Sequence, residues 1–206
     1  MEVPEEQYPY PVEVAVDLAR DFSAERFASA IAVCRHILAL VIAEDRSSEQ
    51  QIARVNILKY LDLQLSRAVR WIDQEADLMA LVLRSLIELR FWADFVSENN
   101  ENAERFLNEA NTDSKDLYER LLKAFPNETT LVANLPGGKR VNPTRIDDQE
   151  ELLWKVCTKF VHPTSLVLDS PGTTILNDGY RRLFAIKIVF YGWCILEMFH
   201  QINWTT

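Results

Sequence analysis

The sequence predicts an all-α fold, an up-and-down helical bundle of four long helices with shorter helices inserted between the third and the fourth. Apolar residues recur at steps of three and four over long segments, and no segment shows the alternation of a strand. Only 5 glycines occur in 206 residues, although a β fold of this size needs many tight turns. The pattern therefore favours long helices with few connections.

The first half of the chain is expected to supply three of the long helices. Residues 1–22 carry three prolines and little periodicity, which indicates an N-terminal arm or a short helix. Residues 23–206 are expected to form a single helical-bundle domain. Ser23 is a favourable N-cap for the first long helix, and short connections indicate antiparallel neighbours. The three predicted long helices cover about 24–44, 49–73 and 76–97.

The second half of the chain combines shorter helices with two loops. Prolines and glycines mark loops over residues 126–148 and 164–177. Pro163 is expected to end or bend the helix that precedes the second loop. The predicted helices of this half cover about 102–110, 114–125, 149–161 and 178–202.

The charge balance argues against one class of function. Acidic residues outnumber basic ones by 31 to 22, which gives a net charge of −9. Extended binding to DNA requires many Lys and Arg side chains against the phosphates. We therefore expect no extended DNA binding, whereas a small local site for RNA or a nucleotide is compatible with this composition.

Cysteine usage and hydropathy indicate a cytoplasmic protein without a membrane span. The three cysteines lie in apolar segments without metal-type spacing, as reduced core thiols do. The most apolar stretch, 183–199, contains Lys187 and Glu197, and a membrane span would tolerate them poorly. We therefore predict a buried helix there. The cysteines are Cys34, Cys157 and Cys194.

A polar pair stands out in the most apolar predicted helix. Arg84 and Glu88 are four residues apart and so share one side of a helix that is apolar on most other sides. Buried charges require partners, and each residue can serve the other. One interpretation is a structural salt bridge. The other is a guanidinium and a carboxylate that face a cleft between helices.

His162 closes the helix before Pro163. Lys155, Lys159 and His162 follow one stripe of this helix, together with Glu151. One interpretation is a solvated face with a Glu151–Lys155 pair. The other is a small phosphate-binding cluster beside an imidazole that can move a proton near neutral pH.

The sequence contains no complete signature for a metal or a cofactor. Glu197 and His200 form one Glu-x-x-His step, but di-iron bundles need two such motifs and two further helix glutamates. Nucleotide-binding glycine loops and the usual hydrolase motifs do not occur. We therefore predict no metal site and no cofactor.

Two short stretches resemble uncharacterised bacterial all-helical proteins related to the HEPN superfamily. They are Leu83–Glu88 (LRSLIE) and Lys159–Ser165 (KFVHPTS), and the similarity in helix order spans roughly residues 50–200. The resemblance implies a helical bundle, often dimeric, in a bacterial stress or defence system. Many HEPN proteins are metal-independent ribonucleases, and others are non-catalytic nucleotide-binding or interaction modules.

The resemblance also implies roles for residues. His162 matches the catalytic histidine of the family, but the arginine that normally precedes it, with four to six residues in between, is missing here. Lysine cannot replace the arginine fork at a phosphate. Either Arg84 supplies the guanidinium, oriented by Glu88, with Lys155 or Lys159 steadying the phosphate, or ribonuclease activity is absent.

Three functional hypotheses follow. The first is a HEPN-like protein, with metal-independent endoribonuclease activity if it is an enzyme. The second is a non-enzymatic helical module for dimerisation or partner binding, and the third is a bundle that binds a small ligand or a metal. The expected partners are a second copy of the chain, RNA or a nucleotide at a local site, or another protein.

Overall fold

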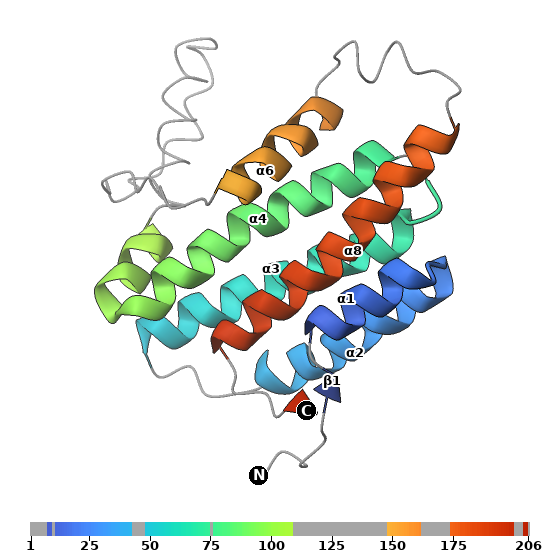
Figure 1. Ribbon diagram of the computed structural model, residues 1–206. Coiled ribbons are helices and arrows are strands. Elements are labelled where there is room, and N and C mark those ends of the chain that lie inside the picture. Colours follow the sequence, from blue (N-terminus) through green and yellow to red (C-terminus); the bar gives the residue numbers. More distant parts are fainter. Residues whose placement is uncertain are drawn as a thin grey trace, which may run out of the picture.

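The computed structural model describes residues 8–9, 11–42, 48–74, 76–108, 148–161, 174–199 and 204–205. These residues form the all-α helical bundle that the sequence predicts (Figure 1). Residues 100–108 form a further helical segment after α4. The helices with assigned bounds are α1 (Pro11–Arg20), α2 (Ala24–Ile42), α3 (Glu49–Trp71), α4 (Ala76–Glu98), α6 (Asp148–Val161) and α8 (Thr174–Phe199).

Helices α4 and α8 form the centre of the bundle. Helix α4 packs against α3, α6 and α8, while α8 also packs against α1, α2 and α3. In Figure 1, α6 lies along the outer side of α4, and α1 and α2 lie on the other side of α8. The helix that carries Arg84 is therefore central in the bundle. Its buried residues are Ala76, Met79, Ala80, Val82, Leu83, Leu86, Ile87, Leu89, Phe91, Ala93 and Val96.

Local sequence signals explain how α3 begins and how α8 approaches it. Ser48 caps α3, because its hydroxyl accepts from the backbone of Gln51 (3.2 Å) while the Gln51 side chain accepts from the backbone of Ser48 (3.1 Å). Gly192 lies where α8 meets α2 and α3. A Cβ there would lie 3.2 Å from Leu65 Cδ2 and 3.7 Å from Cys34 Sγ, so a larger residue would push the helices apart.

Residues 11–20 form a helix that belongs to the bundle. Helix α1 packs against α8, and the short strands β1 (Tyr8–Pro9) and β2 (Trp204–Thr205) pair in parallel. Tyr8 is in register with Trp204. The sequence did not indicate this pairing, because two residues are too few for a strand pattern to be recognised.

Some predicted loop boundaries are wrong. Residue 148 begins α6, and residues 174–177 belong to α8 although we assigned them to loops. The reason at α8 is that no proline or glycine stands between Gly172 and Asp178, so nothing stops the helix from beginning early. The predicted helix over 114–125 and the remainder of both loops lie outside the described residues. No helix in the described part of the chain is both long and apolar enough to cross a membrane.

Candidate functional site

Arg84 and Glu88 form the predicted pair on α4. Arg84 Nε donates to Glu88 Oε1 at 3.2 Å, and the side chains are 27% and 50% exposed, respectively. The pair is therefore not sealed in the core. It lies at the edge of α4 and is open to solvent on one side.

Trp154 of α6 completes this arrangement. Its indole Nε1 donates to Glu88 Oε1 at 3.0 Å, and the Arg84 guanidinium carbon lies 4.8 Å from the centre of its ring. Glu88 thus accepts from both residues, and the indole face stabilises the cation by a cation–π contact. We call the three residues Arg84, Glu88 and Trp154 the α4–α6 seam.

The seam leaves part of the guanidinium available. Arg84 uses its Nε for Glu88, and among the described residues its Nη1 and Nη2 atoms have no hydrogen-bond partner. A planar fork of this kind binds a carboxylate or a phosphate through two parallel hydrogen bonds. The geometry therefore provides an oriented anion-binding group at the surface.

Cys157 lies close to Arg84 but is not suited to be a nucleophile. Burial raises the pKa of its thiol from 9.0 to about 12, although the positive charge of Arg84 lowers that pKa in part. The thiol is therefore protonated at neutral pH, and a protonated thiol is a poor nucleophile. Cys157 serves as a small apolar residue where α6 meets the core.

The predicted phosphate-binding lysines lie apart from the seam. Lys155 pairs with Glu151 at 2.6 Å and is 62% exposed, and Lys159 is exposed as well. At about 100° per residue they project roughly 100° and 140° away from Trp154 around α6. The predicted Glu151–Lys155 pair is thus present, but α6 does not direct these lysines toward Arg84. His162 lies outside the described residues and follows the last residue of α6 in the sequence.

A second polar cluster, between α4, α6 and α8, was not predicted from the sequence. Arg90 Nε of α4 lies 2.9 Å from Glu150 Oε1 of α6, and the Tyr191 hydroxyl of α8 donates to the same oxygen at 3.3 Å. Glu150 precedes Leu153 and Cys157 by three and seven residues, which places it on the buried side of α6. That spacing was the available signal for a buried carboxylate.

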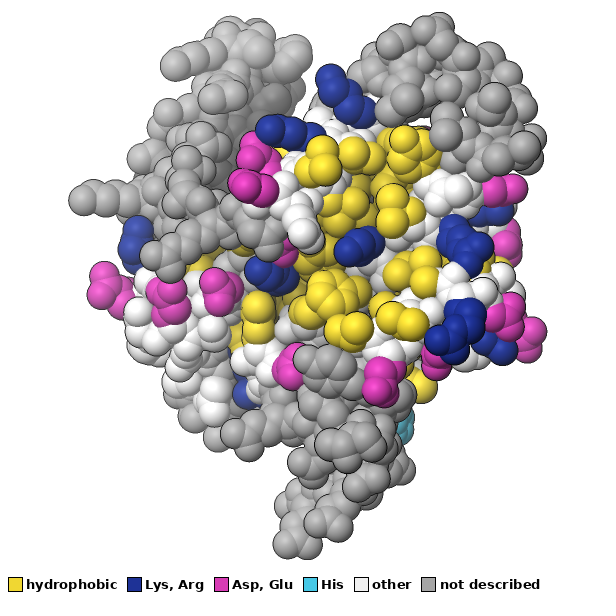
Figure 2. Space-filling view, viewed as in Figure 1, with side chains coloured by type: hydrophobic (Ala, Val, Ile, Leu, Met, Phe, Trp, Pro, Cys, Tyr) yellow, Lys and Arg dark blue, Asp and Glu magenta, His cyan; other side chains and the backbone are white. Residues whose placement is uncertain are grey.

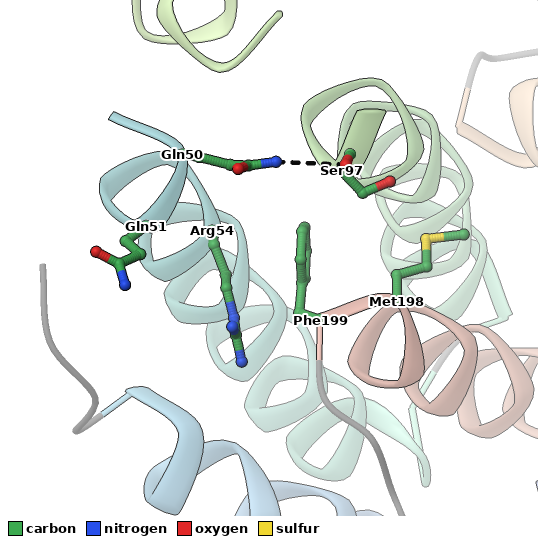
Figure 3. A pocket seen from close by; sticks show the side chains of 6 residues that line it. All are labelled: Gln50, Gln51, Arg54, Ser97, Met198 and Phe199. Carbon is green, nitrogen blue, oxygen red and sulfur yellow. Dashed lines mark hydrogen bonds between the residues drawn. The ribbon is translucent and has the colours of Figure 1, made fainter. Parts of the chain in front are cut away.

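A pocket of about 240 Å³ lies at the C-terminal end of α4 (Figure 3). The amide of Gln50 donates to the carbonyls of Val96 and Ser97, and the Ser97 hydroxyl donates to the carbonyl of Asp94. The Gln50 side chain thus holds the start of α3 against the end of α4, while the Ser97 hydroxyl is bonded within α4, so both groups are engaged in the fold. The lining residues are Gln50, Gln51, Arg54, Ser97, Met198 and Phe199.

The alternative of a metal-binding bundle depends on Glu197 and His200. No group of three or more His, Cys, Asp or Glu side chains able to hold a metal occurs in the part of the chain that the structure describes. Glu197 is exposed on α8, and His200 lies outside the described residues.

Comparison of the chain with models of protein families, with curated proteins and with solved structures finds no match. The function is therefore inferred from the geometry of the seam and from the residues around it.

Proposed function

We propose that the protein is a HEPN-like helical module that binds RNA at the α4–α6 seam and cleaves it without a metal. The observation that carries this proposal is the placement of Arg84, which Glu88 and Trp154 hold against α6 with its Nη edge available. Helix α6 ends at Val161, so the residue after it is His162. An anion-binding guanidinium thus lies on α4, and a residue able to transfer a proton directly follows α6 in the sequence.

The proposed reaction is internal transfer at a phosphodiester. The 2′-hydroxyl attacks phosphorus, the bond to the 5′-oxygen breaks, and the products are a 2′,3′-cyclic phosphate and a 5′-hydroxyl. The 2′-hydroxyl loses its proton and the leaving 5′-oxygen gains one; His162 carries out one of these two transfers, and water carries out the other. Arg84 stabilises the negative charge on the phosphoryl oxygens, and Glu88 keeps the guanidinium oriented.

The surrounding charges favour a short binding site. Lys155 and Lys159 are exposed on another side of α6, where they attract a polyanion toward this helix without contacting the phosphate at Arg84. The net charge of −9 disfavours binding over a longer surface. We therefore expect single-stranded RNA to bind through a few phosphates, with an affinity that falls as salt rises.

The test is cleavage of mixed cellular RNA with a chelator present. Wild type is compared with Arg84→Ala and His162→Ala, and circular dichroism verifies that each variant is folded. Arg70→Ala is the matched control, because Arg70 is an exposed arginine on α3, outside the seam. We expect at least a hundredfold loss in both site variants and wild-type rates in the control. Absence of cleavage by the wild type rejects the catalytic proposal.

An exposed apolar band supports a second candidate, a module that binds a partner protein. Figure 2 shows hydrophobic side chains gathered on the face that α8 crosses. Val12 and Val16 of α1 and Leu183 of α8 are exposed, and Ile186 and Phe190 are half-buried on the same stripe of α8. Under this alternative, Leu183→Gln weakens capture of the partner while Arg84→Ala leaves it unchanged.

A further inference from the structure

Glu150 connects three helices through one carboxylate. Its side chain is only 9% exposed, and its Oε1 atom contacts Arg90 Nε of α4 at 2.9 Å and the Tyr191 hydroxyl of α8 at 3.3 Å. A carboxylate in this position is stable only while its partners remain in place. The contact therefore depends on one position of α6 relative to α4 and α8.

The apolar contacts of α6 restrict its position less strictly. Phe160 packs on the rings of Tyr180 and Phe184, with centroids 4.7 and 5.3 Å away. Such contacts tolerate small displacements, because packing of apolar surface is largely non-directional. A slip of one turn, about 5.4 Å, would separate Glu150 from Arg90 and leave both charges without this pairing.

The seam lies one turn further along the same helix. Glu150 and Trp154 are four residues apart, so they project within about 40° of each other on α6. Whatever fixes Glu150 therefore also fixes where the indole of Trp154 meets Arg84 and Glu88. The Glu150 carboxylate itself contacts Arg90 and Tyr191, on the two central helices.

We propose that Glu150 is a positioning residue for the α4–α6 seam: by pairing with Arg90 and Tyr191 it sets the register of α6 and so holds Trp154 beneath Arg84. The consequence for RNA rests on the proposed function, whereas the consequence for Trp154 does not. The experiment therefore measures the environment of Trp154 and the activity toward RNA separately.

The structural arm uses fluorine NMR of the protein labelled with 5-fluorotryptophan. The chain has 5 tryptophans, and the Trp154 resonance is assigned with Trp154→Phe. Glu150→Gln and Glu150→Leu should move this resonance toward its position in Arg84→Ala, in which the stacking cation is missing. The Trp71 resonance, on α3, should stay in place. The charge swap Arg90→Glu/Glu150→Arg should restore the Trp154 resonance at least in part.

The same variants are then assayed for RNA binding and cleavage. We expect KM to rise about tenfold in Glu150→Leu, the effect of weakening one charged contact, with a smaller change in kcat. A Trp154 resonance that stays at its wild-type position in folded Glu150→Leu overturns the positioning role, whatever RNA does. If the charge-swapped protein does not fold, the Trp154 resonances of Glu150→Gln and Glu150→Leu decide whether Glu150 positions Trp154. If the wild type neither binds nor cleaves RNA but the Trp154 resonance shifts in the Glu150 variants, the positioning role is supported and only the proposed function is rejected.

Discussion

Helices α4 and α6 are held in the bundle by different kinds of interaction. In α4 eleven residues are buried, and all of them are apolar. In α6 only Glu150 and Cys157 are buried among the described side chains. Its contacts with the bundle include a hydrogen bond from Trp154 to Glu88, a hydrogen bond from Tyr191 to Glu150 and an ion pair between Glu150 and Arg90. The first kind of packing supplies stability, and the second specifies position.

The difference explains where a functional site can form. A charged group without a partner is costly in an apolar core. The Arg84 guanidinium, which is partly exposed to solvent, therefore lies where α4 borders α6. A helix positioned by a few directional bonds at such a border orients groups without sealing them from solvent. The contacts of the seam therefore serve to orient its side chains more than to stabilise the fold.

The largest contrast is expected between two leucines. Leu86 of α4 is completely buried, whereas Leu152 of α6 is 64% exposed. Leu86→Ala should lower the free energy of unfolding by about 2–5 kcal/mol, because it removes apolar contacts and leaves a cavity. Leu152→Ala should change it by less than about 0.5 kcal/mol. Urea denaturation measures both, and equal losses would contradict the division between core and α6.

The pH dependence of stability should test whether α6 packs closely enough on the core to bury Cys157. The folded pKa of Cys157 is raised from 9.0 to about 12 by burial, so the unfolded thiol ionises first as pH increases. The contribution to stability is complete below pH 9 and is lost from there toward pH 12, by about 1.4 kcal/mol per pH unit. Urea midpoints between pH 8 and 11 should fall less steeply in Cys157→Ala than in wild type. Identical slopes would mean that Cys157 is not buried in solution.

The smallest contrast concerns neighbouring residues of α6. Trp154→Phe keeps an aromatic ring but removes the hydrogen bond to Glu88, so we expect a loss of about 1 kcal/mol. Lys155→Ala removes only an exposed pair with Glu151 and should cost about 0.3–0.5 kcal/mol. Thermal unfolding of the two variants in parallel provides the comparison. A larger loss for Lys155→Ala would show that the seam does not help to hold α6.

The sequence allowed prediction of features that depend on neighbouring residues. The fold class and the long helices follow from apolar periodicity, and the Arg84–Glu88 and Glu151–Lys155 pairs follow from a spacing of four. Each of these depends on residues within one helix, where the geometry of the backbone is known in advance.

Contacts between helices could not be predicted in the same way. Trp154 bonds to a residue 66 positions earlier, and Glu150 contacts residues of two other helices. Arg90 and Asp94 are four residues apart on α4, and nothing in that spacing indicated a partner for Arg90 on α6. The position of one helix against another depends on the packing of many side chains, which periodicity alone does not specify.

The place of α8 in the bundle has a consequence for how the protein is made. This helix contacts α1, α2, α3 and α4, yet the ribosome synthesises it after all of them. Until it emerges, the apolar surfaces that will surround Trp193 and Phe184, both fully buried in the finished fold, have nothing to cover them. The nascent chain therefore passes through a late stage at which it is open to aggregation or to chaperone binding, and insertion of a single helix ends that stage.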